Sequence, residues 1–147
     1  MAKVDWNCVV KYESSWVEDN CIYILMELCD ESLKNILEIK PKVFHRNPNQ
    51  AINPLEYYIS CEIFIEILEG VKYLYKSNPP IIHRDLKPQN ILITYNNTNN
   101  RFIKICNFDL AINHERTGMA HTKGPGTTRY QSPEVSQSNY YSIKSDI

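Results

Sequence analysis

The sequence predicts an α+β fold, and three stretches of the 147-residue chain carry that prediction. Residues 21–27, CIYILME, are rich in β-branched and aromatic side chains and indicate a strand. Residues 54–76 repeat aliphatic residues at spacings of three and four, which is typical of a long amphipathic helix. Residues 91–95 and 101–106, ILITY and RFIKIC, predict two more strands joined by a polar turn.

The first third of the chain predicts a hairpin, a short helix and a loop, in that order. Residues 8–12 indicate a strand, and the polar residues 18–20 supply a turn into the strand at 21–27. Asp30 is a candidate N-cap for a short helix over ESLKNILEI. Residues 40–54 carry three prolines and three asparagines, so we expect a loop there.

The long helix is the strongest local signal in the chain. Pro54 opens it, and the SNPP sequence at 77–80 ends it. Its apolar stripe consists of Leu55, Ile59, Ile63, Ile67, Val71 and Leu74. We expect four members of this stripe, Leu55, Ile59, Ile63 and Ile67, to stay uncovered by the rest of the chain. Residues 113–145 are polar, contain glycines and lack periodicity, which predicts either a functional loop or disorder.

The bulk composition excludes several classes of protein. A formal net charge of −1 gives no indication of nucleic-acid or anionic-membrane binding. The five cysteines show no CxxC pair, which favours buried reduced thiols over a disulfide framework or a zinc site. No secretory signal opens the chain, and its longest apolar run is too short to span a bilayer. We therefore predict a cytoplasmic protein without nucleic-acid or membrane partners.

One motif indicates the function. Residues 83–90, HRDLKPQN, resemble the catalytic loop of eukaryotic protein kinases. Other landmarks of that family follow in order: NFD at 107–109 in place of Asp-Phe-Gly, GTTRYQSPE at 126–134, and KSDI at 144–147. Upstream, YILMELCD resembles the last N-lobe strand running into the hinge. The resemblance covers essentially the whole chain, with a weaker likeness to stress-responsive kinases that phosphorylate a translation initiation factor.

The resemblance implies a partial kinase domain over residues 1–147. Residues 1–29 would supply N-lobe strands and the hinge, and residues 30–147 would supply the C-lobe part with the catalytic loop and activation segment. No glycine-rich loop, strand lysine or helix-C glutamate precedes Asp5. Asp146 would anchor the backbone of the catalytic loop.

The same resemblance assigns the chemistry. It implies ATP and Mg²⁺ as cofactors and a protein with serine or threonine acceptors as substrate. Asp85 would orient the substrate hydroxyl, Lys87 would reach the transferring phosphate, and Asn90 would offer an oxygen to magnesium. Lys87 indicates serine/threonine specificity, as does Thr127, which would hydrogen-bond near Asp85 and Lys87.

The resemblance also implies a nucleotide pocket. Met26 would be the gatekeeper, Glu27 and Cys29 would present backbone groups to adenine, and Leu92 would pack beneath the ring. The full set of nucleotide-contacting residues is Met26, Glu27, Cys29, Lys87, Asn90, Leu92 and Asn107.

Further residues have structural or regulatory roles by the same resemblance. His83, Phe108 and Tyr12 would stack as an internal column. Arg84 would bind a phosphate on the activation segment, for which Thr122 is the best acceptor and Thr117 the second candidate.

Asn107 departs from the family pattern. An aspartate that binds magnesium normally stands there, so the metal ligands Asn90 and Asn107 would both be neutral amides and metal affinity should fall. Asp109 replaces a glycine, which would strain the backbone if that position required a positive φ. Two hypotheses follow: a serine/threonine kinase domain fragment, or a pseudokinase or scaffold module that lacks phosphoryl transfer.

Overall fold

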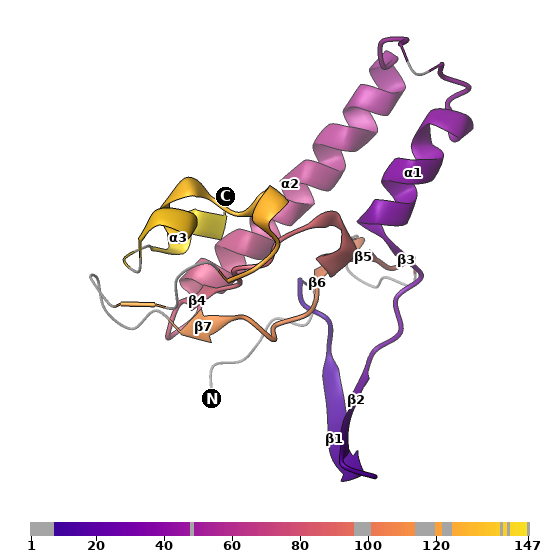
Figure 1. Cartoon of the computed structure of the whole chain (residues 1–147). Helices are drawn as coiled ribbons and strands as arrows, with labels where there is room; N and C mark the ends of the chain where they lie inside the picture. The colour runs from indigo at the N-terminus through magenta and orange to yellow at the C-terminus, as the bar shows by residue number, and fades with distance from the viewer. Residues whose placement is uncertain are drawn as a thin grey trace.

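The structure is a computed structural model, and its helices and strands confirm the predicted α+β class (Figure 1). It describes residues 8–47, 49–95, 101–113, 120–121, 125–138, 140 and 142–146. Helices α1 (Leu33–Val43) and α2 (Pro54–Lys76) lie side by side, and a β-hairpin projects from the end of the molecule opposite their connection (Figure 1).

The projecting hairpin consists of β1 (Tyr12–Glu18) and β2 (Cys21–Met26), paired antiparallel. Asp19 and Asn20 form its two-residue turn with φ of 50° and 61°, the left-handed values that twist a hairpin correctly. The strand predicted at 8–12 was placed too early. Residues 8–10 instead lie in the core, where the Val10 N–H donates to the Ile105 carbonyl at 3.0 Å. Their apolar side chains favour this buried partner over the exposed hairpin.

Two small sheets carry the rest of the strands. The first has the antiparallel order β3 (Glu31–Ser32), β5 (Ile91–Ile93) and β6 (Ile103–Ile105). The second pairs β4 (Ile81–Ile82) with β7 (Ile112–Asn113). The two strands predicted from ILITY and RFIKIC are confirmed, although both are shorter than predicted.

Helix α1 begins and ends later than its sequence suggested. Ser32, rather than Asp30, caps it: the Ser32 hydroxyl accepts from the Asn35 N–H at 3.2 Å. Asp30 is occupied elsewhere, because its carboxylate accepts from the Tyr95 N–H at 2.8 Å. The helix also includes Pro41 in its last turn, so the predicted loop from residue 40 starts only after Val43.

Helix α2 matches its prediction. The Asn53 side chain caps it by accepting from the Glu56 N–H at 2.8 Å, and Pro54 occupies the first turn. Burial rises along the apolar stripe, from Leu55 at 61% exposed to Leu74 at 1%. The uncovered surface predicted along the stripe is therefore confirmed for Leu55 and Ile59. The prediction was wrong for Ile63 and Ile67, which are partly buried and pack against the core.

The core lies where the C-terminal half of α2 meets β5 and β6. Its buried members are Cys8, Val9, Leu33, Val71, Leu74, Ile91, Ile93, Ile103 and Ile105. All five cysteines are free, as predicted, but only Cys8 is buried. The prediction of buried thiols was wrong for Cys21, which is exposed on the hairpin, and holds only in part for the half-buried Cys29, Cys61 and Cys106. Among the described residues, no helix combines the length and apolar character needed to cross a membrane.

The segment predicted to be irregular contains short helices. These are η2 (Thr128–Tyr130), α3 (Pro133–Gln137) and η3 (Ile143–Asp146). Each is too short to show hydrophobic periodicity, although Pro133 and Glu134 are helix-start residues.

Candidate active site

Three of the four residues predicted to be catalytic converge on the carboxylate of the fourth, Asp85. Asp85 follows β4, and its Oδ2 lies 2.7 Å from the Lys87 ammonium. The Asn90 side-chain N–H donates to the Asp85 carbonyl at 2.8 Å and to Oδ2 at 3.0 Å. Thr127 donates to Oδ1 from its backbone N–H at 2.9 Å and from its hydroxyl at 2.7 Å. The structure thus brings Asp85, Lys87, Asn90 and Thr127 together, while their roles stay predictions.

The carboxylate of Asp85 is buried, with 8% of the residue exposed, and it accepts four charged or polar contacts. Burial raises the pKa of Asp85, but the hydrogen bonds from Lys87 and Thr127 outweigh it and leave the pKa below its ordinary value. The carboxylate of Asp85 is therefore ionised at neutral pH. A carboxylate has about four lone-pair sites, so an incoming hydroxyl must displace one of these donors.

The Lys87 ammonium has an N–H group left for a ligand. Its ammonium contacts the Asp85 carboxylate and the Thr127 hydroxyl, the latter at 2.8 Å. An ammonium has three N–H groups, so one can still bond an anionic ligand. The side chain is 21% exposed, which leaves it accessible from solvent.

Gly126 places Thr127, and the sequence reasoning missed this role. Gly126 has a φ of 93°, and a Cβ at this position would lie 2.2 Å from the Arg84 carbonyl oxygen. No other residue fits a backbone that passes this close to the catalytic loop. The glycine immediately before Thr127 was the available signal.

Asp146 anchors the backbone of the catalytic loop, as predicted. Its carboxylate accepts from the His83 N–H at 2.6 Å and from the Arg84 N–H at 2.8 Å. These bonds hold Arg84 in a left-handed conformation with φ of 67°. Burial raises the pKa of Asp146, and the two N–H donors oppose that rise.

Arg84 contacts Leu110, a residue of the predicted activation segment. The Arg84 Nε–H donates to the Leu110 carbonyl at 2.5 Å. Thr122 and Thr117 lie outside the described residues.

The predicted internal column forms in part. The rings of His83 and Phe108 contact each other with centroids 4.9 Å apart. The His83 Nε2–H donates to the Cys106 carbonyl at 2.9 Å, which leaves Nδ1 to accept from the Asp85 N–H at 3.3 Å. Burial lowers the pKa of His83, consistent with this neutral tautomer. Tyr12 was wrongly included, because it lies in the hairpin and is 49% exposed.

Asn107 takes the strained position in the NFD triplet. Its φ is 64°, whereas Asp109 has no positive φ, so the expected strain at Asp109 does not arise. Asparagine tolerates this conformation better than most residues. The Asn107 amide nitrogen lies 3.5 Å from the Asn90 side-chain oxygen. The two predicted metal ligands are thus adjacent.

These ligands fit a magnesium ion poorly. Asn90 and Asn107 offer neutral amide oxygens, whereas Mg²⁺ prefers carboxylates. The amide nitrogen of Asn107, not its oxygen, faces Asn90. Within the described part of the chain, no three His, Cys, Asp or Glu side chains are grouped to hold a metal.

The predicted hinge residues Glu27 and Cys29 follow β2 in the chain. Met26, 49% exposed, ends β2. Within the described part of the chain, the Glu27 carbonyl and the Cys29 N–H have no hydrogen-bond partner, so both are available to a ligand. Burial raises the pKa of the Cys29 thiol, which stays neutral. Leu92 is half-buried on β5, opposite Lys104 on β6.

Lys104 was not recognised from the sequence. Its ammonium forms an ion pair with the Glu27 carboxylate and so ties the predicted hinge to β6. Both side chains are largely shielded, at 14% and 24% exposed. A lysine in the middle of the apolar run IKI was the available signal, since a charged residue there requires a partner.

Comparison with known proteins identifies the family. Residues 1–147 match the protein kinase domain family, and the chain belongs to it. It is 34% identical over 135 residues to the interferon-induced, double-stranded RNA-activated protein kinase of Mus musculus, covering 92% of this chain and 23% of that protein. It is 33% identical over 149 residues to the probable serine/threonine-protein kinase nek3 of Dictyostelium discoideum, covering 100% of this chain and 12% of that protein.

A solved structure confirms the fold class. A chain in the crystal structure of the yeast RNA Pol II CTD kinase CTDK-1 complex superposes with a TM-score of 0.70 at 26% identity. The match covers 98% of this chain and 42% of that one, so this chain corresponds to part of a kinase domain. It spans less than a quarter of the length of the two curated relatives described above.

Proposed function

We propose that this chain is part of a serine/threonine protein kinase that transfers the terminal phosphoryl group of ATP to protein hydroxyls. The observation that carries the proposal is the cluster of Lys87, Asn90 and Thr127 around the Asp85 carboxylate. Phosphoryl transfer depends on positioning and charge stabilisation, and this cluster supplies both. The cytoplasmic location predicted from the sequence stays a prediction.

In the proposed reaction, the residues of the chain act in a defined order. A substrate serine or threonine hydroxyl replaces the Thr127 hydroxyl at Asp85 Oδ1, and the Thr127 N–H keeps its bond to that oxygen. Asp85 orients the hydroxyl oxygen toward the terminal phosphorus of ATP. As the new oxygen–phosphorus bond forms, the bond from that phosphorus to the bridging oxygen breaks and ADP leaves. The hydroxyl proton passes to Asp85 late in this step, because the pKa of Asp85 is lowered. Lys87 directs its spare N–H to a phosphate oxygen and stabilises the charge of the transition state.

Adenine would bind at the predicted hinge. The Glu27 carbonyl accepts from the adenine amino group, and the Cys29 N–H donates to a ring nitrogen. Leu92 packs against one face of the ring. The Glu27–Lys104 ion pair holds this segment against β6 while the ligand binds.

The chemistry that Mg²⁺ would supply, if bound with ATP, is shielding of the phosphate charge. Asn90 and Asn107 would face this ion, with the Asn107 amide turned to present its oxygen. Two neutral ligands make this a weak site.

A pseudokinase or scaffold is the second candidate, and Asn107 is the observation that favours it. A protein of this kind would keep the fold and the nucleotide pocket without transferring phosphate. The two candidates differ in transfer, not in ATP binding.

Transfer from labelled ATP to a mixture of proteins, with and without Mg²⁺, separates the two candidates. A kinase gives Mg²⁺-dependent labelling of serine and threonine that Asp85→Asn removes. Asp19→Asn, in the hairpin turn, is the matched control and should leave labelling unchanged. ATP binding without labelling would identify a pseudokinase, and labelling that survives Asp85→Asn would refute the role of Asp85.

A further inference from the structure

A series of amide hydrogen bonds connects the two residues that would face magnesium. The Asp109 backbone N–H donates to the Asn107 side-chain oxygen at 3.5 Å. The Asn107 amide nitrogen in turn donates to the Asn90 side-chain oxygen, also at 3.5 Å. The Asn90 amide nitrogen donates to the Asp85 carbonyl at 2.8 Å and to the Asp85 carboxylate at 3.0 Å. We call this series, from Asp109 to Asp85, the amide relay.

The Asp85 end fixes the direction of the relay. A backbone carbonyl and an ionised carboxylate only accept hydrogen bonds, so Asn90 must direct its nitrogen to Asp85. The oxygen of Asn90 is then left facing Asn107, and only an N–H group satisfies it. Asn107 therefore presents its nitrogen to Asn90, and its own oxygen accepts from the Asp109 N–H. Both amides are thus oriented by one buried aspartate.

The relay occupies the oxygens that a divalent cation would need. Magnesium binds oxygen atoms in octahedral geometry and prefers carboxylates. The side-chain oxygens of Asn90 and Asn107 each accept an N–H group already. To bind a cation, Asn107 would have to turn its amide and give up its contacts with Asn90 and Asp109. The cation would receive two neutral ligands in exchange, so the relay disfavours it.

The relay leaves N–H groups for a ligand instead. An amide nitrogen carries two N–H groups, and Asn107 uses one of them for Asn90. Within the described part of the chain, the second has no acceptor, and Asn107 is exposed. The third N–H of Lys87 is nearby, because Lys87 and Asn90 contact the same oxygen, Asp85 Oδ2, at 2.7 and 3.0 Å. A phosphate oxygen accepts from both kinds of donor.

The charges around the relay limit how strongly a phosphate is held. Lys87 compensates the carboxylate of Asp85. The Asp109 carboxylate is exposed and forms no ion pair with any other residue that the structure describes. Solvent and salt screen such a charge, so it opposes a phosphate only weakly. A single exposed carboxylate also holds Mg²⁺ poorly, since that ion keeps most of its water shell.

From these contacts we infer that the site holds an adenine nucleotide in its metal-free form, with a phosphate oxygen bonded directly to Asn107 and Lys87. The inference rests on the proposed nucleotide site and adds the ionic form of its ligand. It concerns binding alone, so Mg²⁺ can still be required for transfer. An aspartate at position 107 would have the opposite effect, because it would repel the phosphate and attract the cation.

The test measures ADP binding to the 147-residue chain by calorimetry, once with Mg²⁺ and once with EDTA. ADP has no terminal phosphoryl group to transfer, so the measurement reports binding alone. We expect the two affinities to agree within about twofold, because the cation gains no carboxylate ligand. Asn107→Gly keeps the φ of 64° accessible and removes the amide. It should lower the affinity in EDTA about fivefold, the size of one net hydrogen bond.

A second measurement observes the proposed donor itself. In EDTA, ADP should shift the NMR signal of the Asn107 side-chain N–H groups, which is identified by its loss in Asn107→Gly. A merely structural amide would not respond to ADP.

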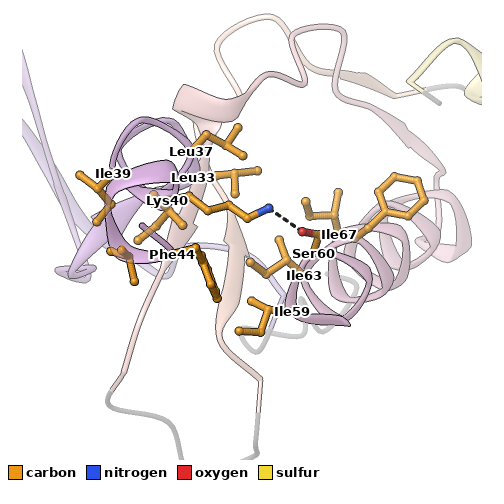
Figure 2. A pocket seen from close by; sticks show the side chains of 12 residues that line it. Leu33, Leu37, Ile39, Lys40, Phe44, Ile59, Ser60, Ile63 and Ile67 are labelled. Atoms are coloured by element: carbon orange, nitrogen blue, oxygen red, sulfur yellow. Dashed lines mark hydrogen bonds between the residues drawn. The ribbon is translucent and has the colours of Figure 1, made fainter. Parts of the chain in front are cut away.

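Two control variants separate this contact from general loosening of the fold. Asn113→Gly removes an amide at the exposed end of β7. Ser60→Ala removes the hydrogen bond that Figure 2 shows between Lys40 on α1 and Ser60 on α2, which is 2.6 Å long. Both variants should bind ADP as the parent chain does. Circular dichroism checks that all variants keep the helical content of the parent.

The outcomes distinguish this inference from the proposed function. Binding that is tighter with Mg²⁺ by about tenfold or more would overturn the inference and leave the proposed function standing. An unmoved Asn107 signal, or an equal loss of affinity in Asn107→Gly and a control variant, would also overturn it. A folded chain that binds ADP under neither condition would refute the nucleotide site itself.

Discussion

Replacing Asn107 with aspartate should strengthen metal-dependent nucleotide binding. Asn107 lies beside Asn90, with 3.5 Å between the amide nitrogen and the Asn90 side-chain oxygen, so a carboxylate there adds a charge next to the proposed magnesium position. The backbone needs no change, because aspartate tolerates the φ of 64° as asparagine does. The fold should therefore be preserved, and any effect reports on the added charge.

The exposure of Asn107 sets the size of the effect. Two unit charges about 4 Å apart attract by about 1 kcal/mol in water, and magnesium carries two charges. The carboxylate should therefore contribute about 2 kcal/mol, or about a thirtyfold gain in affinity. A buried site would give several times more, so the thirtyfold figure depends on solvent access.

The assay is a titration of the chain with a fluorescent ATP analogue at increasing Mg²⁺, repeated without metal. Asn107→Asp should bind more tightly with Mg²⁺ and no more tightly without it. Asn113→Asp, at the exposed end of β7, adds the same charge elsewhere and should leave the Mg²⁺ dependence unchanged. Equal gains in both variants would attribute the effect to net charge and refute the assignment. Asp109→Gly should add nothing, since Asp109 has no positive φ.

Three further outcomes follow from the same geometry. Asp85→Asn should remove phosphoryl transfer while ATP affinity, measured by calorimetry, stays within about twofold, because Asp85 addresses the hydroxyl rather than the nucleotide; a parallel loss of affinity would contradict its role. Gly126→Ala should lower the free energy of unfolding by about 1–2 kcal/mol or more. The reason is that Gly126 has a φ of 93° and that a Cβ there would lie 2.2 Å from the Arg84 carbonyl oxygen. Urea denaturation measures the change, and an unchanged midpoint would contradict the prediction. Burial holds the pKa of His83 below its ordinary 6.5, so below that pH the unfolded chain binds a proton that the folded chain does not. The free energy of unfolding should therefore fall as the pH drops through 6.5, by up to about 1.4 kcal/mol per pH unit. His83→Gln should flatten that part of the pH profile.

The sequence predicted the catalytic cluster because most of it is local. Asp85, Lys87 and Asn90 lie within six residues, and their spacing alone brings the three side chains together. Thr127 could be added because the Gly-Thr pair recurs in the family pattern. Gly126 itself was not predicted, since its need for a bare backbone arises from the Arg84 carbonyl, which is distant in sequence.

The errors in the fold also arise from contacts between distant segments. Asp30 and Ser32 are both good N-cap residues, and the choice between them depends on Asp30 bonding to Tyr95, 65 residues away. The sequence of residues 8–10 alone predicts a hairpin strand, because nothing local shows that their partner is Ile105. The Lys104–Glu27 pair likewise joins segments that no local pattern connects.

The anchor of the catalytic loop has a consequence for folding kinetics. The Asp146–His83 hydrogen bond joins residues 63 apart, and the Thr127–Asp85 bonds join residues 42 apart. The β1–β2 hairpin closes across two residues. Since loop-closure entropy and contact order slow the formation of distant contacts, the hairpin should form early and the Asp85 cluster late. In pulse-labelled hydrogen exchange, the amides of β2 should become protected before the amide of Thr127. A newly made chain should therefore form its hairpin before its catalytic cluster is assembled.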